Sequence, residues 1–106
     1  MVYSVDELKR KITPIAARYN LSAVYLFGSY ARNEATEESD VDILIDGQGS
    51  VVKSLFDMGG LYHDLRETLD KEIDLVTVQG LEREKEVGAF FVDNVINDGV
   101  MLFEQA

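Results

Sequence analysis

The sequence contains no cysteine, which excludes disulfide bonds and thiolate-bound metal ions. It has no apolar run near the roughly 20 residues that span a bilayer. Its opening residues, MVYSVDELKRK, also lack the apolar core of a signal peptide. We therefore expect a soluble, unprocessed protein without membrane contact, and the missing cysteines agree with a cytoplasmic location.

Basic side chains are also few. Ten Lys and Arg residues stand against twenty Asp and Glu residues, which gives a formal net charge of -10. Such a charge repels nucleic acid and attracts cations or a basic partner protein, so direct binding to nucleic acid is not expected. The 106 residues suffice for one packed core, and we predict a single domain over residues 1–106.

The spacing of apolar residues predicts helices that alternate with strands. The expected helices cover residues 4–19, 29–35, 51–69 and 81–97, and the expected strands cover residues 22–27, 39–45, 72–78 and 100–104. Pro14 either kinks the first helix or begins a second one capped by Thr13, and Gly59-Gly60 weakens the third helix. Gly99 is expected to end the last helix. This order predicts an α/β (α+β) fold, with a mixed three- to four-stranded sheet covered mainly on one side by helices.

Two aspartates separated by one residue stand in the second expected strand. Residues two apart on a strand point to the same side with Cα atoms about 6.6 to 6.8 Å apart, so Asp40, Asp42 and Leu44 share one face. Alone, such a pair more often marks a solvated edge strand. Asp74 lies in the next apolar strand, and three converging carboxylates repel one another unless cations bind them. Ligands that are all oxygen atoms indicate Mg²⁺ or Mn²⁺.

A turn that begins with glycine follows the strand at 22–27. Gly28 allows a sharp turn, Ser29 offers a hydroxyl, and the N–H groups of the next helical turn face outward, which together can hold an anion. Arg32 can contact a phosphate or pair with a carboxylate, and Tyr30 can stack on a base or cover the turn. A Gly-Ser pair by itself usually marks only a turn. Together with the aspartates, the turn predicts a site that binds phosphates next to divalent ions, as phosphoryl or nucleotidyl transfer requires.

The strings GSYAR, SDVDILI and IDLV together resemble the G-S-x-x-R, S-D-x-D and third-aspartate pattern of the polymerase β-like nucleotidyltransferase superfamily, particularly its minimal nucleotidyltransferase (MNT) branch. The resemblance covers nearly the whole chain and implies the core fold of that superfamily. The residues that it implies in nucleotide binding are Gly28, Ser29, Arg32 and Ser39. The catalytic residues that it implies, which would also hold two Mg²⁺ ions or Mn²⁺ in their place, are Asp40, Asp42 and Asp74. Asp74 is the expected group to orient or deprotonate the acceptor.

The resemblance also implies a function. It implies transfer of AMP from ATP to a hydroxyl, that of a tyrosine, in a HEPN-domain toxin ribonuclease, with this chain as the antitoxin. Larger relatives carry a further domain for the acceptor, so a hetero-oligomer with the toxin or a homo-oligomer is expected to complete the site. Two alternatives stay open: an antitoxin that neutralises its partner by binding alone, and a transferase for a small molecule such as an aminoglycoside. The nucleotide, the acceptor residue, the number of monophosphates and the stoichiometry also stay open.

Three further features of the sequence carry weaker predictions. Asn33 stands where relatives usually have glycine, and asparagine tolerates the left-handed backbone that such a turn needs. His63 is the only histidine, and its neighbours predict a surface position on a helix rather than a metal ligand. The residues expected in the core or at a subunit interface are Phe90, Phe91, Val95 and Ile96.

Overall fold

The computed structural model describes residues 2–47, 54–78, 80, 93–95 and 97–105. Its elements follow in the order α1 (Val5–Arg18), β1 (Ala23–Phe27), α2 (Gly28–Ala31), β2 (Val41–Asp46), α3 (Leu55–Leu69), β3 (Ile73–Thr77) and β4 (Val100–Glu104). The strands form one sheet in the order β3-β2-β1-β4, in which β1 lies antiparallel to β2 and β4 while β2 and β3 are parallel. The predicted α/β fold with a mixed sheet is confirmed, with four strands.

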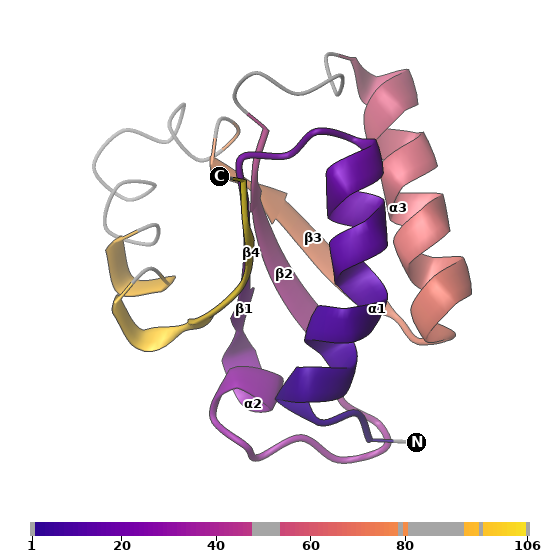
Figure 1. Ribbon diagram of the computed structural model, residues 1–106. Coiled ribbons are helices and arrows are strands. Elements are labelled where there is room, and N and C mark those ends of the chain that lie inside the picture. The colour runs from indigo at the N-terminus through magenta and orange to yellow at the C-terminus, as the bar shows by residue number, and fades with distance from the viewer. Residues whose placement is uncertain (1, 48–53, 79, 81–92, 96, 106) are drawn as a thin grey trace.

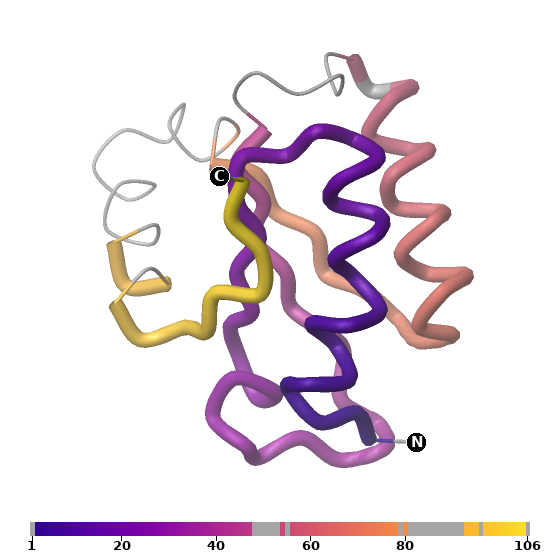
Figure 2. Tube along the Cα trace, viewed as in Figure 1, coloured from indigo at the N-terminus to yellow at the C-terminus, as the bar shows by residue number. Residues whose placement is uncertain are grey.

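Helices α1 and α3 lie side by side on one face of the sheet (Figure 1). The parallel strands β2 and β3 need a crossover connection, and α3 lies within it. Figure 2 shows that residues 28–40, which join β1 to β2, loop out at one end of the sheet. Strand β1 ends there while β2 and β3 begin there, so segments that are distant in sequence meet at this end.

Helix α1 begins with a capping box. The Ser4 hydroxyl accepts a hydrogen bond from the Glu7 N–H at 3.1 Å, and the Glu7 carboxylate accepts one from the Ser4 N–H at 2.9 Å. The helix continues through Pro14, so the alternative of a second helix is wrong. Thr13 is not a cap, because its hydroxyl donates to the Lys9 carbonyl one turn earlier at 2.6 Å.

The core lies between the sheet and the two long helices. Each fully buried Leu or Ile side chain contributes about 1.5 to 3 kcal/mol to stability. The Tyr3 hydroxyl donates to the Leu69 carbonyl at 2.6 Å and ties the segment before α1 to the end of α3. The main buried side chains are Leu8, Ile12, Val24, Leu26, Ile43, Ile45, Leu61, Leu65, Leu69 and Leu102.

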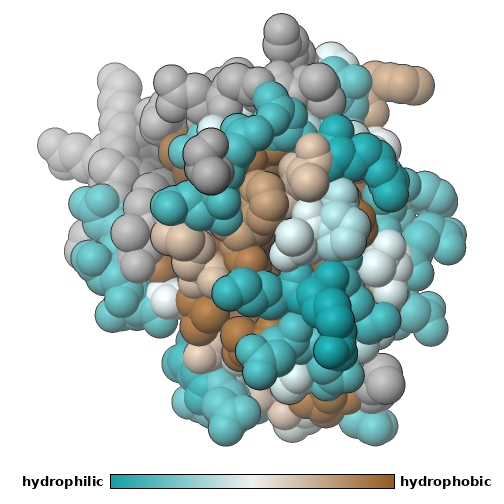
Figure 3. All heavy atoms as spheres, viewed as in Figure 1, coloured by the Kyte–Doolittle hydropathy of each residue, from teal (hydrophilic) through white to brown (hydrophobic). Residues whose placement is uncertain are grey.

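The outer surface is largely hydrophilic on the face that carries α1. Figure 3 shows an apolar band on this face, over the strip between α1 and the edge strand β4. Met101, on β4, is 44% exposed and contributes apolar surface beside this strip. Within the described ranges, no helix is both long enough and apolar enough to cross a membrane.

Strand β2 differs from the prediction in its bounds and in its burial. It covers Val41–Asp46 rather than residues 39–45, so Asp40 lies just before the strand. Leu44, which the alternation placed on the polar face with the aspartates, is fully buried. Strand β2 is a central strand, with β1 on one edge and β3 on the other. On the face that Leu44 shares with Asp42 and Asp46, it is the buried residue between two half-buried aspartates.

The helices also differ from the predicted ranges. Helix α2 spans Gly28–Ala31 rather than residues 29–35, and Arg32 is its C-cap. Helix α3 begins after Ser54, whose hydroxyl accepts from the Asp57 N–H at 3.2 Å, and it continues through Gly59-Gly60. Residues 51–53 of the predicted helix lie outside the described residues.

The helix predicted over 81–97 lies mostly outside the described residues, as do Phe90, Phe91 and Ile96. Its described end, residues 93–95 and 97–98, is helical, and Val95 is buried. The helix ends before Gly99, whose N–H donates to the Val95 carbonyl at 2.7 Å. The predicted stop at Gly99 and the predicted strand over 100–104 are confirmed.

Gly99 occupies a position where a side chain does not fit. A Cβ atom there would lie 2.4 Å from the Val95 carbonyl oxygen and 2.6 Å from the Leu26 carbonyl oxygen. We expect Gly99→Ala to lower the free energy of unfolding by about 1 to 3 kcal/mol. Gly59→Ala is the matched control, because a Cβ atom at Gly59 meets nothing within 4 Å. Since Gly59 lies inside α3, this substitution should raise the free energy of unfolding by up to about 1 kcal/mol. Urea titration followed by circular dichroism measures both, and equal midpoints for Gly99→Ala and wild type would contradict the close approach.

Candidate functional site

The turn after β1 rests against a carboxylate of β2. Gly28 has a φ of 71°, in the left-handed region, and it follows Phe27, which pairs with Asp42 across the antiparallel strands. A Cβ atom at Gly28 would lie 2.0 Å from the Asp42 Oδ2 atom. Both the backbone conformation and the neighbouring carboxylate therefore require glycine here. The predicted turn and the predicted aspartate are in direct contact.

The short helix α2 continues the turn. Ser29 is half-buried, and its carbonyl accepts a hydrogen bond from the Glu34 N–H at 2.9 Å. Tyr30 is 3% exposed and packs in the main core, so it covers the turn from inside and does not stack on a base. Its hydroxyl has no hydrogen-bond partner among the described residues. Asn33 has a φ of 59°, which confirms the left-handed backbone predicted for it.

Arg32 stands exposed at the end of α2. Its Nε atom lies 3.6 Å from the Glu34 Oε1 atom, and this ion pair is weak because the two side chains are 60% and 65% exposed. The positive charge of Arg32 also acts on Asp42, whose pKa it lowers against the other influences. Arg32 is thus within electrostatic range of the aspartates. Its predicted contact with a phosphate stays a prediction.

The strand register places two of the three aspartates side by side. Asp42 on β2 pairs with Asp74 on the parallel strand β3, with the strands about 4.8 Å apart. Asp42 is half-buried and Asp74 is exposed. Asp40 is exposed and lies one residue before β2, so the pleat of the strand does not determine where its side chain points.

The pKa of Asp42 is raised above its ordinary value. The largest cause is burial, which removes water from the carboxylate, and the negative charges of Asp74 and Asp40 follow in that order. Arg32 opposes the rise. Asp42 is therefore within electrostatic range of both other aspartates, and each of them opposes its ionisation.

The three aspartates suit a divalent cation by their negative charge and their oxygen donors, but the distances between their side chains do not yet match a metal site. Within the described part of the chain, no three acidic or histidine side chains are gathered closely enough to hold a metal ion. The available donors are carboxylate oxygens, which suit Mg²⁺ or Mn²⁺, and carboxylates without a counter-ion repel one another. Coordination of metal ions by Asp40, Asp42 and Asp74 stays a prediction.

Ser39 holds the loop that carries Asp40. Its hydroxyl accepts a hydrogen bond from the Thr36 N–H at 2.9 Å, and its own N–H donates to the Thr36 carbonyl at 3.0 Å. The Lys71 ammonium group donates to the Glu37 carbonyl at 3.1 Å and ties the same loop to the turn before β3. Ser39 thereby positions the chain that leads to Asp40, and the nucleotide contact predicted for it stays a prediction.

A cavity of about 320 Å³ opens beside the turn. One wall comes from the turn and the other from the helical segment that ends at Asp98. The lining residues are Phe27, Gly28, Ala31, Arg32, Asn94, Val95, Asp98 and Gly99. The sequence did not reveal Asn94 and Asp98 as site residues, because they lie far from the turn along the chain and no motif surrounds them.

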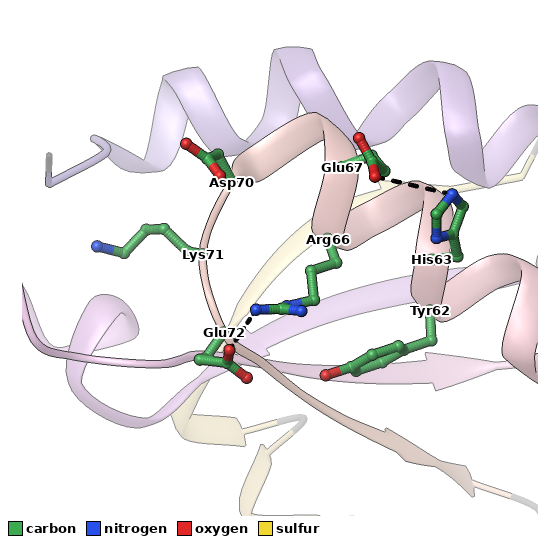
Figure 4. Close-up of a pocket in the computed structure, with 7 residues that line it drawn as sticks. All are labelled: Tyr62, His63, Arg66, Glu67, Asp70, Lys71 and Glu72. Atoms are coloured by element: carbon green, nitrogen blue, oxygen red, sulfur yellow. Dashed lines mark hydrogen bonds and ion pairs between the residues drawn. The ribbon is translucent and has the colours of Figure 1, made fainter.

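A larger cavity of about 480 Å³ includes none of the predicted site residues (Figure 4). Its lining comes from α3 and the turn to β3: Tyr62, His63, Arg66, Glu67, Asp70, Lys71 and Glu72. Arg66 forms an ion pair with Glu72, and the His63 Nε2 atom lies 3.9 Å from the Glu67 Oε1 atom. The His63 side chain is 70% exposed, which confirms its predicted surface position.

Comparison with known proteins gives a family match over most of the chain. Residues 10–106 match the family model described as "Polymerase beta, Nucleotidyltransferase". A protein of Methanocaldococcus jannaschii named "Putative protein adenylyltransferase MJ0435" is 39% identical over 98 residues, which cover 92% of this chain and 96% of that protein.

Two solved structures show the same fold. A toxin-antitoxin structure with AMP-PNP matches with a TM-score of 0.70 and 23% identity, over 92% of this chain and 73% of that chain. A tri-AMPylated Shewanella oneidensis HEPN toxin in complex with MNT antitoxin matches with a TM-score of 0.65 and 21% identity, over 95% of this chain and 73% of that chain. At these identities the likeness is one of fold.

Replacing Asp42 by asparagine should stabilise the fold at neutral pH. Burial and two neighbouring negative charges oppose the ionised carboxylate, and the amide carries no charge. Because the pKa of Asp42 is higher in the folded chain than in the unfolded chain, the folded state binds the proton more tightly. The wild type therefore loses stability relative to Asp42→Asn as the pH rises through the unfolded and then the folded pKa.

We expect a higher Tm for Asp42→Asn at about pH 7 and no difference from wild type at about pH 3. Glu38→Gln is the matched control, because Glu38 is an exposed carboxylate on the loop before β2. Thermal unfolding of all three proteins across this range is the measurement. An equal gain in Tm for both variants would show that the effect is one of total charge and not of the aspartate group.

Proposed function

The chain belongs to the polymerase beta nucleotidyltransferase family, and we propose that it transfers AMP from ATP to a hydroxyl group of a partner protein. The observation that carries the proposal is the contact between the turn and β2, where Gly28 leaves room for the Asp42 carboxylate. This contact puts a backbone turn suited to phosphates beside acidic groups suited to divalent cations. A nucleoside triphosphate bound with its metal ions needs both at once.

The partner that we propose is a HEPN-domain toxin, with this chain acting as the antitoxin. The proposal is supported by the relative named as a protein adenylyltransferase and by the toxin-antitoxin complexes that share the fold, one with AMP-PNP and one with an AMPylated HEPN toxin. The formal net charge of -10 favours a basic partner, as a protein that binds RNA would be. The acceptor that we propose is a tyrosine hydroxyl.

In the proposed reaction the acceptor oxygen attacks the α-phosphorus of ATP. A bond forms between these two atoms, and the bond from the α-phosphorus to the bridging oxygen of the departing pyrophosphate breaks. Asp74 is exposed beside Asp42, and we propose that it accepts the proton of the acceptor hydroxyl. The turn and Arg32 hold the phosphates. Mg²⁺, when held by the three aspartates, supplies positive charge that offsets the charge of the phosphates and the leaving group.

A labelling experiment tests the transfer. The purified chain is incubated with Mg²⁺, ATP labelled at the α-phosphate, and whichever HEPN-type protein is encoded beside it. Label on the partner is followed by gel and mass spectrometry. We expect Asp42→Asn to reduce labelling by at least about 100-fold, because it removes a charge that holds the metal and phosphate centre together. Glu38→Gln should label the partner as the wild type does.

The position of the label separates the possible reactions. ATP labelled at the γ-phosphate should leave no label on the partner, because pyrophosphate departs with that phosphorus. Label from the γ-position would indicate phosphoryl transfer and contradict the proposal. No label from either position, with a stable complex still formed, would favour neutralisation by binding alone.

Metal binding gives a test that does not depend on turnover. Millimolar Mg²⁺ should raise the Tm of the wild type, because a bound cation relieves the repulsion that raises the pKa of Asp42. The rise in Tm should be smaller in Asp42→Asn, and in Glu38→Gln it should equal that of the wild type. Each rise is measured against K⁺ at the same ionic strength. Equal shifts in the wild type and in Asp42→Asn would contradict the assignment of Asp42 as a ligand.

A further inference from the structure

The cavity beside the turn continues the proposed phosphate site. Gly28 and Arg32 line it on one side, and these are residues of the turn that we propose to hold the phosphates. Asn94 and Asp98 line it on the other side. A triphosphate seated on the turn would therefore have the rest of its nucleotide in or beside this cavity.

The close approach of Gly99 fixes the far wall of the cavity. A Cβ atom at Gly99 would lie 2.6 Å from the Leu26 carbonyl oxygen, so the end of the helical segment touches β1 just before the turn begins. Asp98 is the neighbour of Gly99 and lies at this end. Asn94 lies four residues earlier, about 6 Å further along the helix axis. Asp98, next to Gly99, therefore lies near the end of β1.

The charges at the two sides of the cavity orient a nucleotide. Arg32 attracts phosphates, whereas the carboxylate of Asp98 repels them and can only accept hydrogen bonds. In a nucleotide the ribose adjoins the α-phosphate, and its two hydroxyls are hydrogen-bond donors. Phe27, Ala31 and Val95 supply apolar surface to the same cavity, as the flat face of a base requires.

We propose that this cavity binds the nucleoside of the triphosphate and that Asp98 accepts hydrogen bonds from the ribose hydroxyls. The inference rests on the proposed function, and it adds a residue that selects ribonucleotides over deoxyribonucleotides. Asn94 lines the same cavity one helical turn from Asp98, and the base would lie at that end.

Equilibrium binding tests the role of Asp98 without any transfer reaction. Dissociation constants are measured by calorimetry for ATP, 2′-deoxy-ATP and 3′-deoxy-ATP, in Mg²⁺ and without a partner protein. The wild type should bind ATP about tenfold more tightly than at least one deoxy analogue, because a hydrogen bond to a charged acceptor is lost. In Asp98→Ala this ratio should fall to about one, and in Asp98→Asn, which keeps an uncharged acceptor, it should be intermediate.

The ratio of affinities is the decisive quantity, because removing Asp98 also removes a charge that repels phosphates. Asp93→Ala is the matched control: Asp93 is exposed on the same helical segment and does not line the cavity. It changes the net charge equally and should keep the preference of the wild type for ATP.

The outcomes separate the inference from the proposed function. If Asp98→Ala keeps the preference for ATP over the deoxy analogues, or if the wild type shows no such preference, the inference is overturned. The proposed function still stands in that case, provided that the wild type binds ATP and transfers AMP. If Asp98→Ala raises the KM for the partner protein but keeps the preference for ATP, the cavity binds the acceptor, and the inference is overturned as well. No binding of ATP to the wild type overturns both.

Discussion

The contact between the turn at Gly28 and the carboxylate of Asp42 is the constraint on which the rest of the site depends. It exists because β1 and β2 are antiparallel neighbours, with Phe27 opposite Asp42. The register puts the end of one strand against the beginning of the next, and the left-handed glycine turns the chain away without a side chain between them. The register of the sheet thus brings the turn and the acidic group together.

The same arrangement costs stability. Burial raises the pKa of Asp42, and the parallel pairing of β2 with β3, which holds Asp42 beside Asp74, raises it further. The hydrophobic core between the sheet and the two helices offsets this repulsion, since its buried side chains keep the strands in register. Active sites often store such unfavourable interactions, which a bound ligand relieves.

Local patterns predicted the parts of this protein whose causes are local. Alternation located β2, and the glycine and asparagine of the turn predicted its left-handed positions, because each depends on a few adjacent residues. Alternation put Leu44 on the same face as Asp42 but did not predict its burial, because alternation reports which residues share a face and not what covers that face. The course of α1 through Pro14 was left open, because a proline is locally compatible both with a helix interior at a cost and with the start of a new helix.

The candidate site was predictable to the same extent. Its turn and its three aspartates carry motifs, whereas Asn94 and Asp98 join the cavity only because Gly99 brings their helical segment against the end of β1. A tertiary contact of this kind leaves no local signature. Whether two segments meet is decided by the sheet order, and composition does not reveal that order.

The position of β4 determines the order in which the parts of the site become available during synthesis. It lies at the edge of the sheet, yet it pairs with β1, the first strand of the chain, and Gly99 immediately before it completes the wall of the cavity. A ribosome adds roughly 5 to 20 residues per second from the N-terminus. The turn and all three aspartates therefore leave the ribosome before the cavity can close. During synthesis the three aspartates are therefore present for some seconds before the residues that complete the wall of the cavity follow them.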